Sequence, residues 1–102
     1  MDNAIQTILK DFNAHRRLSN TLARLSKLIE QQALYAFSGD VDDIRRNYDL
    51  MLDFMRRGYT DERRNDLYDE MIGKTYRLIQ NIQVELKKKD NPSYHDAAYR
   101  LG

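Results

Sequence analysis

Apolar residues recur at spacings of three and four over most of this 102-residue chain, in three segments that polar breaks separate. Such spacing places the side chains on one face of an α-helix. It predicts three helices, at about residues 2–37, 41–57 and 61–89. The three faces consist of Ile5, Ile8, Leu9, Phe12, His15, Leu18, Leu22, Leu25, Leu28, Ile29, Gln32, Tyr35 and Ala36; of Val41, Ile44, Tyr48, Met51, Leu52 and Met55; and of Leu67, Tyr68, Met71, Ile72, Thr75, Leu78, Ile79, Ile82 and Leu86.

Helix-ending and helix-capping residues set the predicted boundaries. Gly39 and Gly58 can adopt the left-handed conformation that ends a helix, and Asp40 and Thr60 can cap the helices that follow. Neither glycine nor proline lies within residues 2–37. The first helix is therefore expected to be continuous, about 50 Å long, although Asn13 is a poor helix former at which it could kink.

Short connections make neighbouring helices antiparallel, so residues 1–90 are expected to form one all-α domain, an up-down-up three-helix bundle. The second helix is about half as long as the first and can cover only half of its apolar face. The residues expected to remain uncovered are Ile5, Ile8, Leu9 and Phe12. Because an uncovered apolar stripe is usually an interface, we expect a protein partner, a second copy or further helices there.

Composition narrows the functional classes. The 17 Lys and Arg residues nearly balance the 16 Asp and Glu residues, so no excess charge indicates nucleic acid or membrane. The longest apolar run, residues 33–37, is far shorter than the roughly 20 residues of a membrane helix, and the N-terminus does not resemble a signal peptide. With no cysteine in the chain, we expect a cytoplasmic protein.

No residue pattern indicates catalysis. None of the four glutamates has a histidine three residues later, as a carboxylate-bridged metal pair in a helical bundle requires. His15 and His95 are isolated, the serines lack a nucleophile motif, and the four glycines form no phosphate-binding loop. The sequence therefore predicts a non-enzymatic chain with no metal, cofactor or small-molecule substrate. Gly73, inside the third helix, is expected to allow close approach of a neighbouring helix.

The basic doublets give an alternative function. Acids precede three of these clusters by three or four residues: Asp42 precedes Arg45 and Arg46, Asp53 precedes Arg57, and Glu85 precedes Lys88. This spacing is typical of solvated ion pairs along a helix. Arg16 and Arg17 have the fewest acidic neighbours. A nucleic-acid-binding helical module led by these two residues is the alternative to protein binding.

The last twelve residues, NPSYHDAAYRLG, resemble the junction between two tetratricopeptide repeats. Pro92 takes the place of the proline that closes one repeat, Ala97 and Tyr99 match a small and an aromatic position, and Leu101–Gly102 matches a Leu-Gly pair of the next first helix. Upstream, the third predicted helix lacks the small residues that the family requires where its paired helices cross, so residues 2–90 are not themselves expected to form such repeats.

The resemblance implies that a fourth helix starts at about residues 93–101. It also implies that residues 1–90 form the N-terminal domain of a longer helical-repeat protein that binds other proteins. Tyr94, Ala98 and Leu101 in the 91–102 tail are then expected to contact a following helix. The sequence as a whole predicts a protein–protein interaction or assembly domain.

Overall fold

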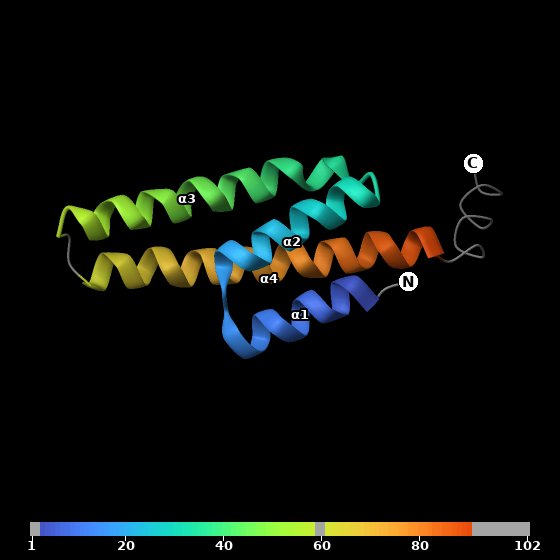
Figure 1. The fold of residues 1–102 in the computed structure, drawn as a ribbon, viewed down its shortest axis with the longest axis horizontal. Coiled ribbons are helices and arrows are strands. Elements are labelled where there is room, and N and C mark those ends of the chain that lie inside the picture. Colours follow the sequence, from blue (N-terminus) through green and yellow to red (C-terminus); the bar gives the residue numbers. More distant parts are fainter. Residues whose placement is uncertain (1–2, 59–60, 91–102) are drawn as a thin grey trace.

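The computed structural model of the chain describes residues 3–58 and 61–90, and in these ranges every regular element is helical. Each helix runs roughly opposite to the one before it, and α1 also contacts α4 (Figure 1). The all-α class is confirmed, but four helices stand where three were expected. They are α1 (Asn3–His15), α2 (Leu18–Gln31), α3 (Ser38–Arg56) and α4 (Asp61–Asp90), with a single 3-10 turn, η1 (Tyr35–Phe37).

The expected continuous first helix is wrong, because the chain turns back at Arg16 and Arg17. The Arg16 backbone N–H still donates to the Phe12 carbonyl at 2.8 Å, but Arg16 adopts a left-handed φ of 49°. Arg17 is extended and accepts the first hydrogen bond of α2, from Thr21. The two halves of the predicted rod therefore form an α1–α2 hairpin.

The end of α2 also differs from the expected one. The Leu34 backbone N–H donates to the Ile29 carbonyl at 2.8 Å, and Ala33 lies between them with a φ of 55°. This is the hydrogen-bond pattern with which helices commonly end on a left-handed glycine, here formed around an alanine. Gly39 was expected to end the first helix, and Asp40 was expected to cap the next one. Both residues instead lie in the first turn of α3.

The second and third predicted helices agree closely with α3 and α4. Gly58 has the left-handed φ of 77° expected of a helix terminator, and its N–H donates to the Met55 carbonyl at 3.2 Å. The expected close approach at Gly73 is wrong, because a Cβ atom placed there would have no neighbouring atom within 4 Å. The predicted fourth helix at 93–101 lies outside the described residues.

The core lies where the α1–α2 hairpin covers the α3–α4 hairpin. It contains buried side chains from all four helices, together with Leu34 from the turn after α2. Thr75 is buried among them, and its hydroxyl donates to the Met71 carbonyl at 2.7 Å, which satisfies its polar group within the helix. None of the described helices is both long enough and apolar enough to cross a bilayer.

Candidate functional site

The N-terminal stripe that was expected to bind a partner is buried inside the chain's own core. Ile5 and Phe12 are 0% exposed and Ile8 is 5% exposed, while Leu9 is partly buried against the same core. The premise that these residues remain uncovered is therefore wrong. The other expected contact residues, Tyr94, Ala98 and Leu101, lie outside the part of the chain that the structure describes.

The turn at residues 16 and 17 causes this burial, because it folds α1 onto α4. The rings of Phe12 and Tyr76 meet edge to face with their centres 4.8 Å apart. Beside them the Tyr76 hydroxyl donates a hydrogen bond to Oδ1 of Asn13. These contacts join the C-terminal end of α1 to the middle of α4 and place Phe12 in the core.

Arg16 and Arg17, the residues of the nucleic-acid alternative, are exposed in the turn between α1 and α2. Residues 3–37 contain five Lys or Arg and two Asp or Glu, so the α1–α2 hairpin is the more basic half of the molecule. Two adjacent exposed guanidinium groups could contact phosphates. The alternative therefore stays a prediction, with the turn as its site.

Several of the other basic residues are paired along their own helices. Arg57 Nε lies 3.1 Å from Asp53, Lys88 Nζ lies 3.4 Å from Glu85, and the Arg46 guanidinium lies 3.8 Å from Asp43. The first two pairs were expected from the spacing, while the third uses Asp43 rather than Asp42. Exposed pairs of this kind contribute little to stability, about 0–1 kcal/mol each.

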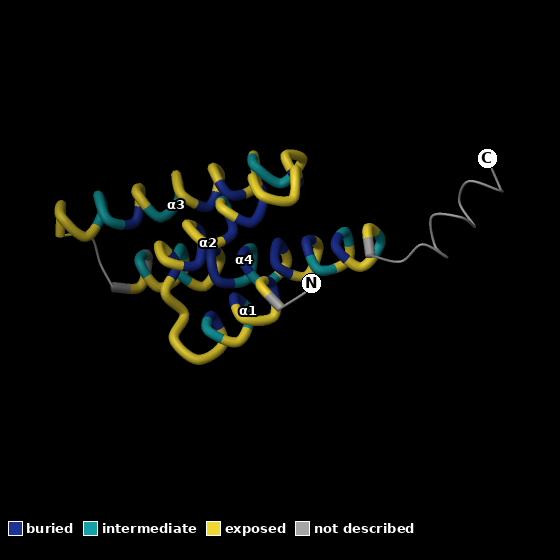
Figure 2. The backbone as a smooth tube through the Cα atoms, turned by 45° about the vertical axis from the view of Figure 1, so that its right-hand side comes forward, coloured by how far each residue is buried: buried dark blue, intermediate teal, exposed yellow. Residues whose placement is uncertain are grey.

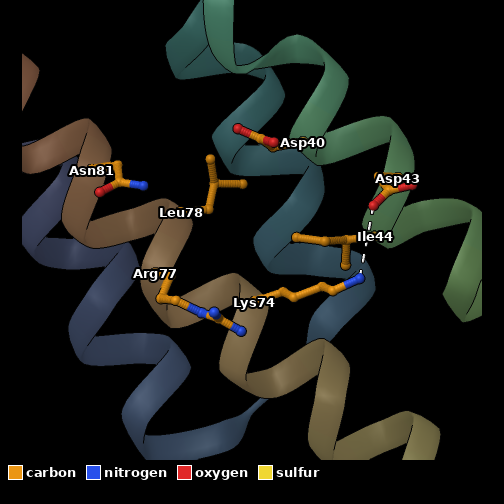
Figure 3. A pocket seen from close by; sticks show the side chains of 7 residues that line it. All are labelled: Asp40, Asp43, Ile44, Lys74, Arg77, Leu78 and Asn81. Atoms are coloured by element: carbon orange, nitrogen blue, oxygen red, sulfur yellow. Dashed lines mark ion pairs between the residues drawn. The ribbon is translucent and has the colours of Figure 1, made fainter.

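A polar cavity of about 230 Å³ lies between α3 and α4. Asp40 and Asp43 project into it from α3, and Lys74, Arg77 and Asn81 project from α4 (Figure 3). Lys74 Nζ lies 3.8 Å from Asp43 and 3.3 Å from Glu70, and Arg77 Nε donates to the Gly73 carbonyl at 3.5 Å. These contacts engage the cavity's cations with the protein itself, and the Lys74–Asp43 pair among them joins α4 to α3.

Among the described side chains, no group of three or more His, Asp or Glu residues is placed to hold a metal ion. The most distinctive surface is apolar instead. The α3–α4 hairpin continues past the α1–α2 turn, and its end is covered by neither α1 nor α2 (Figure 1). We call this end the distal arm: residues 48–56 of α3, residues 57 and 58 after it, and residues 61–70 of α4.

Burial falls abruptly along the distal arm. Met51 is 6% exposed, but Met55, one turn further on the same stripe, is 46% exposed, and Leu50 is 43% exposed. After Met51 in α3, and from Glu62 to Glu70 in α4, none of the described side chains is buried (Figure 2). The arm nevertheless carries the apolar residues Leu50, Leu52, Phe54, Met55, Leu67 and Tyr68.

Most of these residues belong to the apolar helix faces that the sequence predicted, but their exposure could not be predicted from the spacing. A stripe shows which face of a helix is apolar, whereas the length of the covering helices decides how much of it is buried. A first helix of 36 residues would have covered Met55. Because the chain turns at Arg16, α2 covers α3 only as far as Met51. The apolar residues beyond Met51 therefore stay exposed or half-buried on the arm.

Comparison with models of protein families, with curated proteins and with solved structures found no match for this chain. The arrangement of the chain itself therefore supports the functional proposal. We call residues 3–47 and 71–90 the body, whose four helices cover one another, while the distal arm stays uncovered by α1 and α2.

Proposed function

We propose that this chain is a non-enzymatic protein–protein interaction module that binds its partner through the distal arm. The observation that carries the proposal is the change in exposure along one stripe, from buried Ile44 and Met51 to half-exposed Met55. A helical face of this composition is normally covered by another element. A contiguous apolar surface that lacks such cover is typical of a docking site.

The arm also has the form that helical recognition requires. Two antiparallel helices present an apolar seam with charged residues on both sides, and amphipathic helices bind such surfaces through residues at spacings of three and four. Tyr48, Leu52 and Met55 follow that spacing on α3. The half-buried Leu67 and Tyr68 lie on α4 in the same hairpin.

The tail is the basis for the further proposal that this module belongs to a larger protein. The resemblance of residues 91–102 to a tetratricopeptide junction supports the proposal that residues 1–90 precede a helical-repeat array. Such arrays bind proteins along their length. The distal arm would then be a second contact surface, at the opposite end of α4 from the array.

Thiol labelling tests the proposed surface, because the chain contains no cysteine of its own. Met55→Cys places one thiol on the arm, and Val84→Cys, at a residue 51% exposed on the distant part of α4, is the matched control. Each variant is reacted with a maleimide, under reducing conditions, at a concentration too low for self-association. The rates are compared in buffer and in an extract of cells that express the chain.

If the arm binds a partner, the extract slows labelling of the Met55→Cys thiol several-fold and leaves the Val84→Cys thiol unchanged. Equal slowing of both thiols would indicate a non-specific effect of the extract. If the Met55→Cys thiol is protected neither in extract nor in concentrated pure protein, the arm is not a docking surface and the proposal fails.

A further inference from the structure

The body of the molecule shows what the distal arm lacks. From residue 71 onward α4 packs against α1 and α3, and α2 packs against α1 and α3 in turn, so buried side chains of all four helices form one core. In the arm, α3 and α4 lie together alone among the described helices, so no described helix forms an opposite layer over its stripe (Figure 1). A second copy of the chain carries an identical pair of antiparallel helices, and two such pairs complete a four-helix bundle.

We propose that two copies of this chain associate arm to arm, with the arms antiparallel about a two-fold axis. This inference rests on the proposed function and names its partner. An isologous contact of this kind requires the same patch to be complementary to itself. The charges along α3 meet that requirement.

Asp49, Leu52 and Arg56 follow each other at spacings of three and four, so they lie along one side of α3. Asp49 and Arg56 are both exposed, and neither forms an ion pair with another described residue. When two copies of α3 lie antiparallel and cross level with Leu52, Arg56 of each copy comes opposite Asp49 of the other. The symmetric dimer therefore contains this charge pair twice.

The same residues disfavour the parallel arrangement. With the arms side by side and both tips together, Arg56 and Arg57 would meet their own counterparts, and like charges across an interface are strongly unfavourable. The apolar residues Tyr48, Leu52 and Met55, with Asp49 and Arg56 beside them, repeat the arrangement of antiparallel coiled coils, in which flanking charges set helix orientation. The charge pattern thus selects one of the two geometries.

The expected contact is small. The arm's helical segments are about 10 residues long, or roughly 15 Å each, which is well short of the extensive interface of an obligate dimer. We therefore expect a reversible dimer, with a dissociation constant on the order of micromolar. Sedimentation velocity from about 1 to about 500 µM covers that range.

Charge reversal tests the geometry. Arg56→Glu places two carboxylates opposite each other at both sites of the dimer, and Asp49→Arg places two guanidinium groups there. We expect each variant to raise the dissociation constant at least about 10-fold. The double variant Asp49→Arg/Arg56→Glu recreates both pairs with the charges exchanged and should restore dimerisation.

Lys27→Glu and Glu30→Arg, at exposed positions on α2, change the net charge by the same amounts and serve as matched controls. They should leave the dissociation constant unchanged. Far-UV circular dichroism verifies that each variant stays helical. If a charge variant does not fold, a disulfide experiment provides an independent test, in which Asp49→Cys and Arg56→Cys copies are mixed under mild oxidation. Arm-to-arm dimers should form the mixed disulfide faster than either variant crosslinks to itself.

The outcomes separate this inference from the proposed function. A monomer at all concentrations overturns the dimer, yet protection of the Met55→Cys thiol in extract would still support the arm as a docking surface for another protein. A dimer that resists Arg56→Glu, or that the double variant fails to restore, overturns the antiparallel arm-to-arm geometry. Restoration by the double variant supports it.

Discussion

Ala33 ends α2 in a conformation that an L-residue with a Cβ atom rarely adopts. Its φ of 55° belongs to the left-handed region, where a side chain costs roughly 1–2 kcal/mol relative to glycine. The hydrogen bonds from Leu34 and Gln32 back into α2 hold it there, and buried Leu34 fixes the turn against the core. The strain at this residue is offset by the contacts of its neighbours.

Ala33→Gly should therefore stabilise the fold. Glycine removes the Cβ penalty but makes the unfolded chain more flexible, so we expect a net gain of about 0.5–1 kcal/mol in the free energy of unfolding. Urea denaturation followed by circular dichroism measures it. Ala23→Gly, at an exposed position inside α2, is the control and should cost about 1 kcal/mol. A loss of similar size at both positions would contradict the left-handed turn.

At the scale of the element, the sequence predicts a helix well where its ends have a local cause. Gly58 separates α3 from α4, and the predicted helices at 41–57 and 61–89 nearly coincide with Ser38–Arg56 and Asp61–Asp90. The turn at Arg16 has no such marker, because arginine is an ordinary helix residue. The apolar spacing also continues across the break in phase, so periodicity alone cannot reveal it.

The same limit applies to the candidate site. His15 is the position that a continuous helix would have turned toward the core, but it is exposed in the structure. Ile5 and Phe12 belong to the stripe that was expected to remain uncovered, yet they are buried because α1 reverses direction. The chain reversal at Arg16 thus explains why the uncovered apolar surface lies on the distal arm and not at the N-terminus, where it was expected.

Gly73 offers a test within α4. An interior glycine weakens a helix by about 1 kcal/mol relative to alanine, and an added Cβ atom would meet no atom within 4 Å. Gly73→Ala should therefore raise the free energy of unfolding by about 0.5–1 kcal/mol, measured by urea denaturation. Gly58→Ala also has space, but its φ of 77° penalises a Cβ atom, so it should destabilise by about 1 kcal/mol. If Gly73→Ala destabilised the protein as well, a close neighbour must approach α4 there.

At the scale of the whole molecule, the body and the distal arm should differ in local stability. The body contains every buried side chain of α1 and α2, whereas the arm beyond Met51 has no buried side chain among its described residues. Regions with few buried apolar contacts open locally, without global unfolding. We therefore expect amides of residues 52–56 and 64–70 to exchange with solvent through local opening in the monomer.

Phe12→Ala distinguishes the two regions. Truncating a fully buried phenylalanine typically costs about 3–5 kcal/mol, and each 1.4 kcal/mol changes an equilibrium constant tenfold. In native-state hydrogen exchange of dilute protein, amides in the middle of α2 and in residues 75–82 of α4 should exchange at least about 100-fold faster than in the wild type. Arm amides should keep their rates, because local opening does not require global unfolding. Val84→Ala, at an exposed residue, should change neither region.

Equal acceleration of both regions would mean that the arm opens only when the whole chain unfolds. Unchanged rates in the body would mean that Phe12 does not belong to the core.

The dependence of exchange rates on protein concentration tests whether a second copy covers the arm. If a second copy covers the arm, arm amides of the wild type should exchange more slowly as the protein concentration rises. Body amides should keep their rates, because dimerisation adds contacts only where α1 and α2 leave α3 and α4 uncovered. The surface that is least stable in one copy would then be the one that two copies stabilise.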